Sequence, residues 1–149
     1  MMISDNDLTR IAEEICYSLF VDGVTPPAQT SDVTRVMTAI VDINGDWNGS
    51  VAVRCKRSTA EQIASVMFDS PAPDLSSDDV VDALGEFANM AAGAVKGMLD
   101  GEKYLGLPTV GEGSDYTMVV PHTTEVLGVE YPLADGVLRL SVHELRRSS

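Results

Sequence analysis

The chain has few basic residues for its size. Ten Lys and Arg residues stand against 23 Asp and Glu, which gives a net charge of −13 over 149 residues. Binding to nucleic acid depends on a basic surface, and so does attraction to anionic lipid. The charge therefore argues against both kinds of partner. Its simplest interpretation is that it keeps the protein in solution.

Cysteines and long apolar runs are also scarce. The two cysteines, Cys16 and Cys55, fit no CxxC or metal-ligand spacing, which predicts reduced, buried side chains. No uninterrupted apolar run approaches the roughly 20 residues that span a bilayer. The N-terminal residues lack the basic and apolar segments of a signal peptide. We therefore expect a cytoplasmic protein. Walker, GxGxxG and HExxH motifs are missing, so no cofactor or metal of its own is expected.

The length and a hydrophobic content of 44% predict one folded domain, residues 1–149. Helices are expected at about 5–21, where Ser4 can act as the cap, at 58–68 after a Ser58–Glu61 capping box, and at 76–99. Strands are expected at 33–43, 49–54, 116–120, 124–131 and 136–144. Turn signals stand at Asn44-Gly45 and Asp135-Gly136, and a helical turn is expected near Tyr104. This order predicts an α+β fold, a mostly antiparallel sheet covered by helices.

The longest predicted helix, residues 76–99, has two distinct faces. One face is apolar, and the face opposite to it carries a polar ridge of Asp82, Glu86, Asn89, Gly93 and, at its end, Lys96 or Gly97. An ordinary solvated face would carry long charged side chains, whereas this one is low and centred on a short amide. It suits docking against another macromolecule. The apolar face comprises Val80, Val81, Leu84, Phe87, Ala88, Ala91, Val95, Met98 and Leu99.

The segment from Asp82 to Lys96 resembles the signature helix of the CheC/CheX/FliY-type chemotaxis phosphatases. Their pattern D-x-x-x-E-x-x-N, followed by a glycine and a lysine, is matched here by Asp82, Glu86 and Asn89. The segment 107–110, Leu-Pro-Thr-Val, resembles the part of the family that follows this helix, and the hairpins around 48–50 and Gly136 have counterparts there. E-x-x-N alone is a weak pattern, and its surroundings make it specific.

The resemblance implies a CheC-like fold and a phosphatase that hydrolyses the aspartyl phosphate of a CheY-like response regulator. The regulator would carry the acyl phosphate and Mg²⁺. Phosphoryl transfer gains most from positioning, and an amide can orient a water without repelling the phosphate. Asn89 is therefore the candidate for positioning the attacking water. The resemblance further implies that Glu86 docks to the regulator's lysine.

The remaining ridge residues each have two interpretations. Asp82 matches the family pattern, but near the helix start it can simply interact with the helix dipole. Gly93 would allow close approach of a partner's backbone. Lys96 can contact a partner at the periphery or face solvent. Met90 can touch a partner or belong to the edge of the core. His122 and His143 are expected to be structural, and Trp47 is either a packing residue or part of an interface rim.

One E-x-x-N helix per chain resembles the CheX branch of the family, whose members often pair through their sheets, so a homodimer is expected. Two alternatives to the enzyme remain. The same fold could bind a receiver domain or flagellar component without hydrolysis, although Asn89 would then have no evident use. A structural dimer without a phosphorylated partner is the third possibility, in which case the ridge is coincidental.

Overall fold

The computed structural model describes residues 2–114, 120–133 and 136–146. The helical elements are α1 (Asp5–Leu19), α2 (Arg57–Met67), the short 3₁₀ helix η1 (Ala72–Asp74) and α3 (Ser77–Met98). The strands are β1 (Arg35–Gly45), β2 (Gly49–Lys56), β3 (Lys103–Leu105), β4 (Thr109–Ser114), β5 (Thr123–Leu133) and β6 (Gly136–Leu145).

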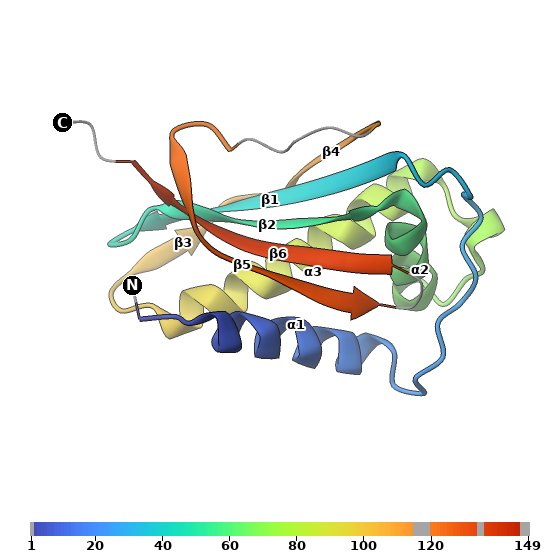
Figure 1. The fold of residues 1–149 in the computed structure, drawn as a ribbon, viewed down its shortest axis with the longest axis horizontal. Coiled ribbons are helices and arrows are strands. Elements are labelled where there is room, and N and C mark those ends of the chain that lie inside the picture. The colour runs from blue at the N-terminus through green and yellow to red at the C-terminus, as the bar shows by residue number, and fades with distance from the viewer. Residues whose placement is uncertain (1, 115–119, 134–135, 147–149) are drawn as a thin grey trace.

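All six strands form one antiparallel sheet in the order β3-β1-β2-β6-β5, and β4 pairs with β1 along the same edge as β3. The three α-helices lie against one face of this sheet (Figure 1). Side chains alternate between the two faces of a strand, so every second residue points toward the helices. Met37, Ala39, Val41 and Ile43 of β1 follow this alternation and are buried. The α+β fold with a helix-covered antiparallel sheet is therefore confirmed.

Helix α3 begins and ends where its sequence predicts. Ser76 caps its N-terminus in a capping box with Asp79, and Leu99 is the C-cap. The side chain of Lys103 is buried and donates to the carbonyl oxygens of Leu99 and Gly101, at 2.6 Å each. These bonds satisfy carbonyls that a helix end leaves free. Both ends of α3 are thus fixed, and so is the register of its polar ridge.

The apolar face of α3 packs against the sheet and the other two helices. Burying a side chain the size of Phe87, which has no exposed surface, contributes about 1.5–3 kcal/mol. Three residues of the expected apolar face are less buried: Val81 and Leu99 are half-buried, and Met98 is exposed in the last turn of the helix. The fully buried set is Val80, Ala83, Leu84, Gly85, Phe87, Ala88, Ala91, Ala92 and Val95.

Several local predictions are confirmed. Ser4 forms a capping box with Asp7 at the start of α1, which ends two residues earlier than expected. The turn after β1 is present, and Gly45 there has a φ of +135°. A side chain at Gly45 would collide with the backbone of Glu102, so glycine is required. The capping box of Ser76 was not among the sequence predictions.

Other local predictions are wrong. Helix α2 begins at Arg57 rather than at the expected Ser58 cap, and its N-cap, Lys56, makes no side-chain capping bond. The segment near Tyr104 is strand β3 because it pairs with the end of β1. Strand β4 was not predicted. The strand expected at 116–120 falls mostly on residues outside the described ranges, as does Asp135 of the last turn.

Glu61 lies inside α2 and holds the loop that precedes β1. Its side chain is 5% exposed. It accepts hydrogen bonds from the backbone N–H groups of Gln29 and Thr30 at 2.9 and 2.8 Å, and from the Thr30 hydroxyl at 2.6 Å. Arg57 donates to it at 3.2 Å and also pairs with Glu112 of β4. One carboxylate thus joins α2 to a distant loop.

The same contacts shift the pKa of Glu61. Burial raises this pKa, but the hydrogen bonds from Thr30, Arg57 and Gln29 outweigh burial and hold it below the usual 4.5. A carboxyl whose pKa is lower in the folded state stabilises that state above the unfolded pKa. The contribution disappears as the pH falls below about 4.5 through the folded value.

We predict that Glu61→Gln lowers the free energy of unfolding at pH 7 by about 1–3 kcal/mol, because backbone donors lose a charged acceptor. The deficit should shrink as the pH falls from 6 to 3, where the wild-type carboxyl becomes protonated. Urea unfolding followed by circular dichroism across this range measures both effects. Glu14→Gln, an exposed carboxylate on α1, is the control. A deficit independent of pH would contradict the assigned role.

Candidate functional site

The polar ridge runs along the side of α3 that faces away from the sheet. Asp82 and Glu86 are exposed, whereas Asn89, Gly93 and Lys96 are half-buried. All five lie within the capped helix, so their spacing is that of a regular α-helix. The structure thus places the predicted site residues on one continuous surface, with the amide at its centre.

Glu86 and Asn89 are three residues apart, which puts them about 4.5 Å apart along the helix axis and on adjoining positions of one face. Within residues 2–114, 120–133 and 136–146, neither side chain has a hydrogen-bond or ion-pair partner. Asp82 and Lys96 are likewise unpaired among these residues. A carboxylate and an amide left free at neighbouring positions can both bind groups from outside the chain.

Two glycines of α3 differ in what surrounds them. Gly85 is buried, and a Cβ there would lie 3.3 Å from Pro108 and 3.6 Å from Val110, so this glycine lets β4 and the preceding segment approach. Among the described residues, nothing beyond the backbone of its own helix lies within 4 Å of a Cβ position at Gly93. The packing of this part of the chain gives no reason for a glycine at 93, although glycine weakens a helix.

A groove of about 600 Å³ opens beside the ridge. Asp82 and Glu86 border it, and Met90 lies in its wall while also packing against the core. Met90 therefore belongs to the edge of the core and also reaches the surface next to Glu86, while its contact with a partner remains a prediction. The rest of the lining comes from the ends of α1 and α2 and from α3, namely Ser18, Leu19, Val66, Met67, Phe68 and Ala83.

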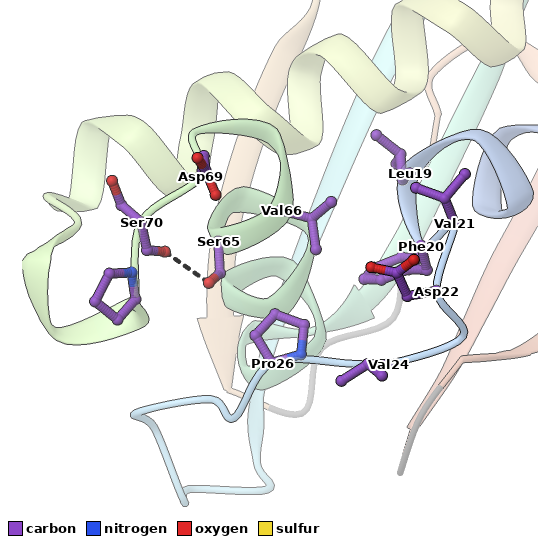
Figure 2. Close-up of a pocket in the computed structure, with 11 residues that line it drawn as sticks. Leu19, Phe20, Val21, Asp22, Val24, Pro26, Ser65, Val66, Asp69 and Ser70 are labelled. Atoms are coloured by element: carbon purple, nitrogen blue, oxygen red, sulfur yellow. Dashed lines mark hydrogen bonds between the residues drawn. The ribbon is translucent and has the colours of Figure 1, made fainter.

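A second hollow, of about 440 Å³, lies between the end of α1, the loop after it and the end of α2 (Figure 2). Leu19 and Val66 line both this hollow and the groove. The Ser65 hydroxyl donates to the backbone carbonyl of Ser70 at 2.6 Å across the turn that ends α2. Both serines line the second hollow.

The histidines and cysteines lie away from the ridge, as the sequence predicts. His143 of β6 is buried and bonded to Ser141 at 2.9 Å, and burial lowers its pKa. His122 is exposed in the turn before β5. Cys16 and Cys55 are free and buried. Burial raises their pKa values to about 11 and about 12, so both are protonated and unreactive at neutral pH.

Sequence reasoning missed the part of the site that α1 and α2 supply. Phe68 appeared only as the last residue of a helix, yet its side chain is 44% exposed beside Glu86's groove. Ser18 was placed in the first helix without a role, and Leu19 was expected only to face the core. The sequence did contain one signal, namely a large apolar residue just before the helix break at Ser70-Pro71. This position indicates an aromatic side chain at the surface, but it does not indicate which residues surround that side chain.

No group of three or more His, Cys, Asp or Glu side chains within the described ranges could hold a metal ion. In the same ranges, no helix has the length and apolar content needed to cross a membrane.

Known proteins resemble this chain in both sequence family and fold. Residues 37–131 match the family described as chemotaxis phosphatase CheX. No curated protein matches the chain. Among solved structures, CheX from Vibrio vulnificus has a TM-score of 0.71 at 17% identity, with 93% of each chain covered. A CheX from Desulfovibrio desulfuricans gives 0.70 at 20% identity, covering 93% of this chain and 97% of that one.

A third similar structure is a complex of CheX with CheY, BeF3 and Mg²⁺ from Borrelia burgdorferi. It has a TM-score of 0.70 at 16% identity and covers 98% of this chain and all of that one. At such identities these structures establish the fold, while the family match spans well over half of the sequence. The chain belongs to the CheX family of chemotaxis phosphatases.

Proposed function

We propose that this protein hydrolyses the aspartyl phosphate of a CheY-like response regulator, with Asn89 and Glu86 at the centre of the site. The observation that carries the proposal is the free Glu86–Asn89 pair on a helix whose ends and apolar face are fixed by the fold. Family membership and the solved complex of a relative with CheY support it.

The proposed reaction requires this chain mainly to position the attacking water. Water attacks the phosphorus, the bond between phosphorus and the aspartate oxygen breaks, and inorganic phosphate and a free carboxylate are formed. The regulator would hold Mg²⁺ as part of the substrate. The Asn89 carbonyl oxygen can accept a hydrogen bond from the water, while its N–H group donates to a phosphoryl or regulator oxygen. The amide adds no negative charge near the phosphate.

Glu86 has a different proposed role, because a free carboxylate would repel a phosphoryl group. One turn from Asn89, it is placed to pair with the regulator's lysine and so set the register of the complex. Asp82 and Lys96, both unpaired among the described residues, extend this contact along the ridge. Met90 and Gly93 complete the surface that we assign to the regulator. The homodimer and the cytoplasmic location expected from the sequence remain predictions.

The second candidate is a receiver-binding module that hydrolyses nothing. The groove and the exposed carboxylates would serve binding alone equally well. Asn89 favours the enzyme, since a half-buried amide without a partner in the described chain has no evident use in a pure binder. Phosphate release distinguishes the two functions directly.

We predict that Asn89→Ala lowers phosphate release from acetyl-phosphate-charged, Mg²⁺-loaded CheY-like receivers of the source organism by about 100-fold or more. Binding of the receiver should change little, because the amide acts on the water. Asn6→Ala, an exposed asparagine of α1, is the matched control. Failure of the wild type to accelerate release from any demonstrably phosphorylated receiver would leave the binding module.

Glu86→Gln should weaken receiver binding about tenfold and reduce its dependence on salt, because a cation on the receiver loses its counter-charge. The rate constant at saturating receiver should fall much less than in Asn89→Ala. Titration calorimetry at low and high ionic strength measures the first effect. Glu14→Gln again provides the control, and equal affinity of both variants would rule out the docking role.

The variant Gly93→Leu distinguishes an effect on the stability of the fold from an effect on receiver docking. Since nothing among the described residues beyond the backbone of its own helix lies within 4 Å of the Cβ position, the side chain should fit the fold and raise helix stability by up to about 1 kcal/mol. The taller ridge should nevertheless weaken receiver binding about tenfold or more through steric conflict. Thermal unfolding and affinity are measured together. Gly97→Leu, one turn further along, should stabilise equally with a smaller loss of affinity.

A further inference from the structure

We propose that the groove beside Glu86 takes a large apolar side chain of the phosphorylated receiver, next to the cation that Glu86 binds. The inference rests on the proposed function, which places a receiver on the polar ridge. It adds a specificity site built by α1 and α2, outside the signature helix. Phe68 is the residue that we assign to recognising this side chain.

The groove is continuous with the proposed docking surface. Asp82 and Glu86 belong both to the polar ridge and to the border of the groove. Met90, one turn after Glu86, lies on the groove side of α3. A receiver whose cation pairs with Glu86 must therefore cover the mouth of the groove. A side chain of the receiver that lies within one side-chain length of this cation is close enough to enter the groove.

The charges around the groove define the chemistry of its occupant. Two carboxylates lie on its border, and among the residues that the structure describes no Lys, Arg or His contributes to the lining. An anionic occupant would be repelled by both carboxylates. An uncharged apolar side chain adjacent to a cation matches the surface, since the cation meets Glu86 while the apolar group meets the walls. The volume of about 600 Å³ lies within the roughly 300–1,000 Å³ of ordinary binding pockets.

The walls combine one fixed aromatic ring with adaptable neighbours. Phe68 is the C-cap of α2, and its N–H bonds to the carbonyl of Ala64. Asp69 follows with a φ of +49°, and Ser70 bonds back to Ser65 through both its N–H and its carbonyl group. This turn holds Phe68 at the rim with 44% of its surface exposed. Covering such a ring stabilises a complex more than covering an isolated aliphatic group.

Methionines make up much of the remaining surface. Met67 and Met90 are both half-buried, from α2 and α3 respectively. Unbranched thioether side chains adapt to differently shaped occupants. The groove therefore suits an aromatic or branched aliphatic side chain without demanding a single shape. It would select receivers by the presence of this group beside their cation.

The test measures binding without turnover, on an Asn89→Ala background with beryllofluoride-activated, Mg²⁺-loaded receivers of the source organism. Two variants alter the groove: Phe68→Ala removes the aromatic wall, and Ser18→Trp obstructs the opening from the exposed end of α1. Glu13→Trp adds the same bulk elsewhere on α1, and Leu145→Ala removes an exposed apolar side chain beside Asn48, at the far end of the sheet. Circular dichroism verifies that each variant folds.

We expect both groove variants to raise the dissociation constant tenfold or more, with the two controls within twofold of the background. An alanine scan of the receiver's apolar side chains around its lysine should then find one whose loss is not additive with Phe68→Ala, which identifies the occupant. A receiver that binds the background protein but binds Phe68→Ala and Ser18→Trp equally well overturns this inference and leaves the proposed function intact.

Failure of the proposed function gives a different result. If no activated receiver binds the Asn89→Ala or wild-type protein, the docking surface is wrong, and the groove assignment falls with it. If receivers bind but the wild type releases no phosphate, only the hydrolytic step fails, and the groove variants still decide the present inference. The inference is also overturned if a small molecule saturates the groove while Phe68→Ala has no effect on receiver binding.

Discussion

The fold and the site both depend on the packing of α3 against the sheet and against its two neighbouring helices, α1 and α2. Phe87 and Leu84 have no exposed surface and contribute to a core that includes β1, β2 and β6. Because a helix has one rotational setting that buries such a stripe, the same packing decides which side chains face outward. The polar ridge is thus oriented by residues that never touch a partner.

This arrangement leaves a group of polar side chains unsatisfied by the rest of the described chain. Glu86 and Asn89 have no stabilising partner among the described residues, and selection for stability alone would allow both to be replaced. Elsewhere carboxylates are used structurally: Glu61 binds a loop, Glu112 pairs with Arg35 and Arg57, and Glu125 pairs with Arg139. What distinguishes the ridge from other exposed carboxylates such as Glu14 is that Glu86 lies beside the amide of Asn89 on one face of a helix capped at both ends.

The surroundings of the ridge differ on its two sides. On one side, Gly85 lets Pro108 and Val110 pack closely against α3, so this flank is closed by the chain itself. On the other, residues at the ends of α1 and α2 line the groove together with α3. A partner that lies across the ridge therefore meets a filled surface on one flank and an open apolar one on the other. This asymmetry gives a docking partner a defined orientation.

Sequence alone determined α3, its polar ridge, the Ser4 cap of α1 and the α+β order, because the signals involved are local. Helix caps and turns depend on hydrogen bonds between residues about three apart, and helical periodicity shows within a few turns. The same locality explains why the Ser58–Glu61 prediction was wrong: Glu61 finds its partners at Gln29 and Thr30, about 30 positions away.

Only the tertiary structure decided what lies beside Glu86. Strand β4 forms because β1 offers it a free edge, and Phe68 becomes part of the site because α2 ends next to α3. Ser18, Phe68 and Met90 are far apart in sequence, and no periodic pattern connects them. Their proximity comes from burying three amphipathic helices on one sheet, which is a property of the whole core rather than of any segment.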